Sequence, residues 1–338
     1  MVFKICLIGC GPHAVKRHGP SLKKYAIVNS DVELTACCDI NEQKAVSFQN
    51  TFNFKRHYTD LSEMLDIEKP DAVSLISPVH LTADLAVRIL EMGYPLIMEK
   101  PPGRTMEEIM RMIKAADKNN VPNRVAFNRR YTPLVRELKR MLTERFKPEE
   151  IHNIRYDLFR VNRKENEFSK TAIHAVDAVR FLSESDYRHV RFHYQDLPQL
   201  GENVTNIYMD CTFTSGATAH INICPVAGVN IERAAVNALN HTFFVNIPLW
   251  FEYDSPGRLT HIEKNKIVTD VTGNDISDGN ELFESSGFYY ENETFFNDLK
   301  SGIAPKGDLK SAVQSVEVAE CMEKRLLEYK GGKNGQDN

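Results

Sequence analysis

The chain has 338 residues, a length that corresponds to about two domains. Hydrophobic residues make up 42% of it and charged residues 26%, which excludes wholesale disorder. The formal net charge of −4 lacks the basic excess of nucleic-acid binders, and no apolar run approaches the ~18 residues of a membrane span. We therefore expect neither a nucleic-acid partner nor a membrane partner.

The first ~120 residues alternate short apolar, β-branched runs with helical patterns. Two helix starts are marked by an N-capping residue with a glutamate three places on, at Asp60 and Thr105. The apolar runs cover residues 3–8, 32–39, 71–77, 94–98 and 124–127. Strands that alternate with helices predict a doubly wound parallel sheet of the α/β class.

A glycine-rich turn follows the first predicted strand and fits the dinucleotide-binding pattern G-x-G-x-x-A. Gly9 permits a tight turn, Gly11 lets the backbone approach a pyrophosphate, and the helix start offers free amides to phosphate. The cofactor-binding residues predicted here are Gly9, Cys10, Gly11, Pro12, His13 and Ala14. The alternative is an ordinary glycine turn. Gly19-Pro20 predicts an interruption early in the helix that follows.

Asp39 ends the second predicted strand, where a carboxylate accepts hydrogen bonds from the ribose hydroxyls of NAD. The same carboxylate repels the 2′-phosphate of NADP, so we expect NAD as the cofactor. The alternative is an aspartate that only faces solvent.

Lys100 lies in Glu99-Lys100-Pro101, at the end of the fourth predicted strand. Cofactors of open α/β sheets bind at the carboxyl ends of strands, so this lysine is a candidate for proton exchange. The alternative is a solvated surface charge. His174, near the start of the amphipathic helix predicted at 171–182, is a second candidate, with capping or packing at a domain junction as its alternative.

After about residue 150 the pattern changes to long runs with a period of two, which predicts a mostly antiparallel sheet. The runs cover residues 151–161, 187–197, 203–213, 217–226, 241–253 and 259–268, and further helices are predicted at 289–301 and 308–328. We expect a Rossmann domain at residues 1–122, an α+β domain with a large open sheet at 123–330, and a flexible tail at 331–338.

The seven cysteines form no C-x-x-C pair and no Cys/His group at zinc spacing. An odd number of scattered cysteines is typical of buried thiols in a reducing compartment. We therefore expect a cytoplasmic protein without a metal site.

The segments GCGPHA, ELTACCD, DAVSLISP, MEKP, VAFNRRY and IHAVDAVRFL, in that order, resemble the Gfo/Idh/MocA family of NAD(P)-dependent oxidoreductases. The resemblance extends to FFNDLKSGIAPKGDLKSAVQSVEVAE and so spans nearly the whole chain. It implies a Rossmann domain, an open-sheet domain, and sugars, cyclitols or related polyols as substrates. It also implies that Lys100 contacts cofactor and substrate and that His174 acts on the reacting hydroxyl. We expect Ser77, Pro78 and Glu99 to contact the cofactor as well.

The chain departs from the family pattern just before His174. Where family members often carry D-x-G-x-H, this sequence has Lys170 and Ala172 at the Asp and Gly positions. Three interpretations remain open: Lys100 and His174 suffice for proton transfer, Lys170 contacts an anionic substrate, or turnover is lost. Arg129 or Arg130, in the run Asn-Arg-Arg-Tyr, is a further candidate for anion binding, the alternative being exposed cations at a helix start.

The main hypothesis is an NAD-dependent dehydrogenase that oxidises a secondary hydroxyl of a sugar, cyclitol or nucleotide-sugar, with Lys100 or His174 taking the proton. One alternative is a glycoside hydrolase that uses bound NAD for transient oxidation and elimination. The other is a dinucleotide- or sugar-sensing protein without turnover. An uncovered sheet face tends to be buried by association, which predicts a homodimer or homotetramer through the second domain.

Overall fold

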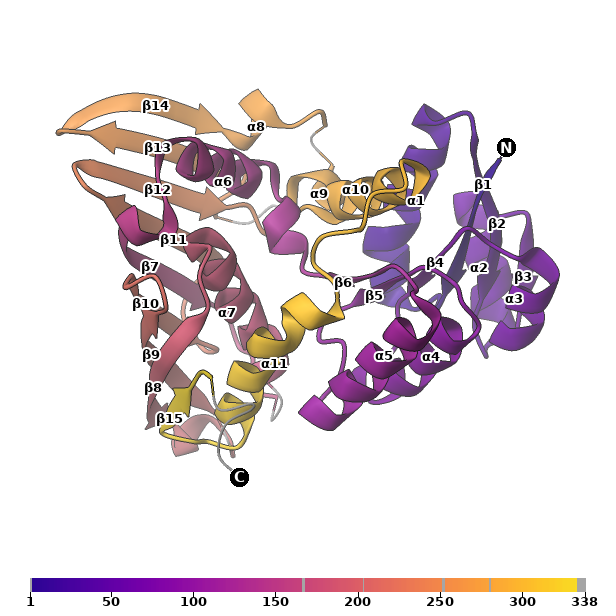
Figure 1. Ribbon diagram of the computed structural model, residues 1–338, viewed down its shortest axis with the longest axis horizontal. Helices are drawn as coiled ribbons and strands as arrows, with labels where there is room; N and C mark the ends of the chain where they lie inside the picture. The colour runs from indigo at the N-terminus through magenta and orange to yellow at the C-terminus, as the bar shows by residue number, and fades with distance from the viewer. Residues whose placement is uncertain (1, 166–167, 203, 251–252, 280, 333–338) are drawn as a thin grey trace. The chain divides into compact units, whose positions relative to one another are not determined.

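The computed structural model describes residues 2–165, 168–202, 204–250, 253–279 and 281–332. Two compact units are present. The first unit comprises residues 1–128 and 287–313, and the second unit comprises 129–286 and 314–338. Figure 1 shows the two units with their helices and strands labelled. Of the predicted tail, residues 333–338 lie outside the described part of the chain.

The first unit is built on a six-stranded parallel sheet in the order β3-β2-β1-β4-β5-β6. This confirms the predicted doubly wound sheet, whose strand order reverses between β1 and β4. The short polar strand β3 was not predicted, since its sequence Arg-His-Tyr has no apolar run. The strands are β1 (Phe3–Ile8), β2 (Val32–Cys38), β3 (Arg56–Tyr58), β4 (Ala72–Leu75), β5 (Leu96–Glu99) and β6 (Asn123–Ala126).

Both predicted helix caps of this unit are confirmed. The Asp60 side chain accepts a hydrogen bond from the Glu63 amide at 2.8 Å, and Thr105 Oγ1 accepts one from the Glu108 amide at 3.2 Å. The predicted interruption of the first helix takes the form of a π-helical turn, η1 (Ala14–His18), which passes into α1 (Gly19–Val28). The other helices are α2 (Glu42–Phe52), α3 (Leu61–Glu68), α4 (Val79–Glu91), α5 (Met106–Asn119) and α10 (Phe288–Lys300).

Residues 287–313 complete the first unit from far along the chain. Helix α10 packs on α1, where Tyr25 donates to Asn297 Oδ1 at 2.8 Å. Arg124 of β6 is fully buried and forms an ion pair with Asp298 at 2.7 Å. The compact unit therefore extends six residues beyond the predicted boundary at 122 and takes in a segment that the sequence analysis assigned to the second domain.

The second unit contains a nine-stranded sheet in the order β14-β13-β12-β11-β7-β10-β9-β8-β15. Strands β7 and β10 are parallel, and the other strand pairs that the structure describes in this sheet are antiparallel, as predicted. The strands are β7 (Ile151–Phe159), β8 (Tyr187–Asp196), β9 (Thr205–Phe213), β10 (Thr218–Cys224), β11 (Ile231–Ala238), β12 (His241–Ile247), β13 (Arg258–Glu263), β14 (Lys266–Thr272) and β15 (Glu328–Lys330).

Several predicted bounds in this unit were wrong. The run at 259–268 is not one strand but part of a hairpin, because Lys264 and Asn265 adopt left-handed backbone with φ of 46° and 65° and turn β13 into β14. Strand β11 was missed, and the predicted strand 241–253 already ends at Ile247. Residues 203, 251 and 252 of the predicted runs lie outside the described part of the chain.

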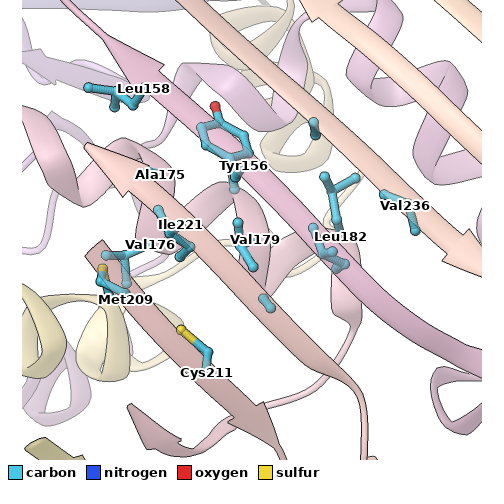
Figure 2. Close-up of a cluster of buried hydrophobic side chains, with 14 of the residues drawn as sticks. Tyr156, Leu158, Ala175, Val176, Val179, Leu182, Met209, Cys211, Ile221 and Val236 are labelled. Atoms are coloured by element: carbon cyan, nitrogen blue, oxygen red, sulfur yellow. The ribbon is translucent and has the colours of Figure 1, made fainter. Parts of the chain in front are cut away.

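Helices α6 (Pro133–Arg145), α7 (Ser169–Ser183) and α11 (Leu309–Glu323) contribute to one hydrophobic core with this sheet. Figure 2 shows the centre of that core, where Val176, Val179 and Leu182 of α7 lie among side chains of the strands, including Tyr156 and Ile221. The alternate residues of the strands, such as Asp210 and His220, are exposed. One face of the sheet is therefore buried and the other is polar and accessible.

Short helical turns complete the described elements: η2 (Asn128–Tyr131), η3 (Pro148–Glu150), η4 (Pro198–Leu200), α8 (Gly273–Ile276) and α9 (Leu282–Ser285).

Candidate active site

Most of the residues predicted to contact a cofactor follow the carboxyl ends of β1, β2, β4 and β5. These strands are parallel, so their carboxyl ends lie on one edge of the sheet, and the strand order reverses between β1 and β4 on that edge. Ligands of open α/β sheets bind at such a reversal. The first unit therefore brings its part of the predicted site together: the turn after Gly9, then Asp39, Ser77, Pro78, Glu99 and Lys100.

Each of the two positions in the turn is occupied by glycine for a different structural reason. Gly9 has a φ of +95°, and a Cβ at this position would lie 1.9 Å from the carbonyl oxygen of Ile76, so only glycine fits. At Gly11, no heavy atom of the described residues lies within 4 Å of the Cβ position. This open space lies at the start of the helical residues 12–28, where free amides favour an anion. The turn therefore fits a pyrophosphate, and the buried Ala14 sits one turn into the helix.

Asp39 ties the end of β2 to this turn. Its Oδ2 accepts a hydrogen bond from the Cys10 amide and its Oδ1 accepts one from the Asn41 amide, both at 2.9 Å. The carboxylate is thus already oriented by two backbone donors. Carboxylate oxygens have further lone pairs, so these bonds leave capacity for a ribose hydroxyl.

Glu99, the last residue of β5, is the centre of a hydrogen-bonded group. Its Oε1 lies 3.0 Å from His13 Nε2 and 2.7 Å from His18 Nε2, and its Oε2 accepts a hydrogen bond from the Lys100 amide at 3.1 Å. Burial opposes ionisation of Glu99, but the two imidazoles outweigh it and hold the pKa of its carboxyl well below the usual value. Glu99 therefore stays anionic and fixes the backbone at Lys100. Lys100 itself is half-buried and precedes a cis peptide bond to Pro101.

His174 and Lys170 lie in the second unit, near the start of α7. His174 is 5% exposed and Lys170 is half-buried. Since they are four residues apart in an α-helix, their side chains lie on the same face, one turn from each other. The helix thus presents a cation beside the histidine, where the family pattern often has a carboxylate.

The two arginines of the Asn-Arg-Arg-Tyr run are held by buried carboxylates within the second unit. Arg129 donates to Glu232 from Nε at 2.9 Å and from Nη2 at 2.7 Å, and Arg130 donates to Asp177 from Nε at 2.7 Å. Arg129 is only 6% exposed, so the alternative of exposed cations at a helix start was wrong. The role of Arg129 in substrate binding stays a prediction.

Glu232 is a residue that the sequence analysis missed. It is fully buried and also accepts hydrogen bonds from Tyr156 Oη at 2.8 Å and from Arg160. Burial raises the cost of its charge, but Arg129 and Arg160 reverse this and place the pKa of Glu232 below its ordinary range. The only sequence signal was the weak alternation of residues 231–238, because no apolar run marks strand β11.

A membrane-spanning role finds no support in the helices: within the described part of the chain, none is both long and apolar enough to cross a bilayer.

Residues 3–127 match the family model described as "Oxidoreductase family, NAD-binding Rossmann fold" (GFO_IDH_MocA). The chain is 33% identical over 106 residues to levoglucosan dehydrogenase of Pseudarthrobacter phenanthrenivorans, a match that covers 31% of this chain and 27% of the relative. It is 25% identical over 217 residues to inositol 2-dehydrogenase of Salmonella paratyphi B, covering 62% and 64%. The chain thus matches between about a quarter and two thirds of the length of these relatives.

Among solved structures, a levoglucosan dehydrogenase in complex with NADH has a TM-score of 0.81 at 19% identity, covering 98% of this chain and 100% of that one. At this identity the likeness concerns the fold, and it extends through both units.

Proposed function

We propose that this chain, whose residues 3–127 match the model of the Gfo/Idh/MocA family of NAD-binding oxidoreductases, is an NAD-dependent dehydrogenase of a sugar or polyol. The observation that carries the proposal is the carboxyl edge of the first sheet. There Gly11 leaves open space at a helix start, Asp39 is oriented for a ribose, and Lys100 follows the neighbouring strand. The relatives that are named as levoglucosan and inositol dehydrogenases support a carbohydrate or cyclitol substrate.

In this proposal the chain binds and orients both reactants and moves one proton. The nicotinamide, when bound, supplies the hydride acceptor, so the substrate carbon loses a hydride and its hydroxyl loses a proton. Lys100 and His174 are the residues that we assign to the substrate hydroxyl. The backbone of Lys100 is held by Glu99, and His174 is held on a well-packed helix, as precise proton transfer requires.

Lys170 narrows the proposed substrate to anionic members of the class. An ammonium group one helical turn from His174 attracts a carboxylate or phosphate on the substrate, whereas the usual aspartate repels it. Lys170→Asp tests this point. We expect a steep rise in KM for an anionic sugar, with a smaller change for its neutral analogue. Equal changes in KM for both substrates would show that Lys170 does not contact the anionic group of the substrate.

The activity test is the reduction of NAD by the purified chain, followed by NADH absorbance, with paired neutral and anionic sugars and cyclitols. Lys100→Met should lower kcat by roughly 10²–10⁴, the range for a general acid–base group. NAD affinity should change far less, because the turn after Gly9 is untouched. Release of a glycosyl leaving group without NADH would favour the hydrolase instead. Binding of both ligands with neither product would favour the sensor.

We also propose that the chain associates through the accessible face of the nine-stranded sheet, as a homodimer or homotetramer. Phe244 lies between the buried Phe243 and Val245 of β12 and is 46% exposed, so its ring lies on that face. Light scattering should give a mass of two or four chains, and Phe244→Asp should shift the protein toward the monomer. A wild-type monomer at micromolar concentration would contradict the proposal.

A further inference from the structure

Three side chains of the first unit meet near the carboxyl edge of its sheet. His13 Nε2 and His18 Nε2 both lie against Glu99 Oε1, at 3.0 and 2.7 Å, and the three atoms lie within 4.8 Å of one another. His18 and Glu99 are buried, with side-chain exposures of 3% and 10%, while His13 is 51% exposed. The group is therefore closed on the protein side and open toward solvent at His13.

The π-helical turn η1 is what brings the two histidines together. Residues five apart on a regular α-helix are separated by about 140° around the axis, so His13 and His18 would point in different directions. In η1 the Gly19 amide bonds to the Ala14 carbonyl, five residues back, and the wider turn reduces the angle between residues five apart. Phe288 of α10 packs edge-on against both imidazoles, with ring centres 5.6 and 5.4 Å away, and supports this arrangement.

We propose that His13 Nε2, His18 Nε2 and Glu99 Oε1 bind one first-row transition-metal ion of the Zn²⁺ type. Two imidazoles and one carboxylate are a known ligand set for zinc with an open fourth position. Imidazole ligands favour Zn²⁺, Co²⁺ or Ni²⁺ over Mg²⁺ and Ca²⁺, which prefer oxygen. Donors about 2.1 Å from a tetrahedral ion lie about 3.4 Å apart. The two nitrogen–oxygen distances must then lengthen by roughly 0.4 and 0.7 Å, which small side-chain rotations provide.

The site is linked to Lys100 through Glu99. While Oε1 contacts the ion, Oε2 still accepts the hydrogen bond from the Lys100 amide, so the carboxylate bridges the metal and the backbone of that residue. His18 Nδ1, which carries the proton when Nε2 binds metal, has no hydrogen-bond partner in the described part of the chain. Because such partners typically strengthen metal binding 10–100-fold, we expect weaker binding than at a structural zinc site.

Spacing along the sequence does not indicate this site, because Glu99 comes from a strand end 81 residues after His18. Cysteine and histidine spacing detects zinc sites only where the ligands are close in sequence. The proposal is independent of the proposed dehydrogenase activity, since it concerns the chain without substrate or dinucleotide.

The test is calorimetric titration of the full chain, freed of metal and dinucleotide, with Zn²⁺ alone. We expect the wild type to bind one Zn²⁺ ion per chain at this site. The Zn²⁺ affinity of the site should fall at least tenfold in His13→Gln and in His18→Gln. Glutamine keeps a hydrogen-bond donor toward Glu99 but is a poor zinc ligand. His220→Gln is the matched control, because His220 pairs with Asp210 at 2.6 Å without a second histidine. That variant should bind Zn²⁺ like the wild type.

A second readout is the visible absorption of bound Co²⁺, which reports the ligand geometry directly. We expect the bands of a low-coordinate nitrogen and oxygen site in the wild type and their loss in His13→Gln. His13 is half exposed, so this variant tests the proposal even where His18→Gln fails to fold. Equal Zn²⁺ affinity in the wild type and His13→Gln would overturn the proposal, and so would the absence of stoichiometric binding to the wild type.

Discussion

Gly9 and Gly11 stand two residues apart in the same turn, and the structure predicts opposite consequences when each is changed to alanine. At Gly11 the added methyl group meets no heavy atom of the described residues within 4 Å, and φ is ordinary. Gly11→Ala should therefore leave the free energy of unfolding within about 0.5 kcal/mol of the wild type. The methyl group would instead occupy space that we assign to the pyrophosphate.

The expected loss of NAD affinity follows from that assignment. A hydrogen bond from a backbone amide to a charged group contributes about 1.5–3 kcal/mol, so losing one such bond weakens NAD binding by roughly 10- to 150-fold. At Gly9 the methyl group would lie 1.9 Å from the Ile76 carbonyl oxygen, on backbone with a φ of +95°. Gly9→Ala should therefore destabilise the fold by at least about 2 kcal/mol.

Calorimetric NAD titration and urea unfolding of the wild type and both variants measure the two quantities separately. Wild-type NAD affinity in Gly11→Ala would refute the placement of the pyrophosphate at this turn. A loss of stability in Gly11→Ala as large as that in Gly9→Ala would refute the claim that the space at Gly11 is open.

Three further predictions concern buried or oriented charges. Glu232→Gln leaves two buried guanidinium groups without their counter-ion and should cost about 3–5 kcal/mol in urea unfolding. Asp270→Asn, in an exposed pair, should destabilise the fold far less, and similar losses in the two variants would mean that water reaches Glu232. Asp39→Asn should reduce the preference for NAD over NADP at least about tenfold in equilibrium titrations, because it removes the repulsion of the 2′-phosphate. An unchanged ratio of the two affinities would show that Asp39 does not contact the ribose.

The third prediction concerns His261. The pKa of its imidazole is lowered by burial, by the Arg145 charge and by His241. The unfolded chain therefore takes up a proton that the native state resists, and stability falls as the pH drops below about 6.5. His261→Gln should therefore lose less stability than the wild type between pH 7.5 and 5.5, and parallel losses would contradict this.

The local signals of the first unit were strong enough to predict most of its elements. Five of its strands are apolar runs bounded by turns, and the capping residues at Asp60 and Thr105 mark two helix starts. These features depend on neighbours in the sequence, which is why a single chain reveals them. The positive φ of Gly9 is of the same local kind, whereas its tight contact with Ile76 comes from a residue distant in the sequence.

What could not be predicted depends on partners that are distant in the sequence. Nothing near Arg129 indicates that its guanidinium is buried against Glu232, about a hundred residues later. In the same way, the arrangement of His13 and His18 requires a π-helical turn and the end of β5. Strand β11 was not predicted because its residues 232–235 are charged or small. Its place in the sheet comes from pairing with β7 and β12.

The discontinuous first unit has a consequence for how the protein is made. Arg124 is fully buried and contacts Asp298 and the backbone at Lys306, which the ribosome adds after residues 129–286 of the second unit. At about 5–20 residues per second, the roughly 160 intervening residues take on the order of 8–30 s to synthesise. Throughout that time Arg124 lacks its counter-ion Asp298, and the face of α1 that packs against α10 is uncovered. Completion of the first unit thus waits until residues 287–313 have been synthesised, and a fragment ending at residue 128 would expose the same unfinished surface permanently.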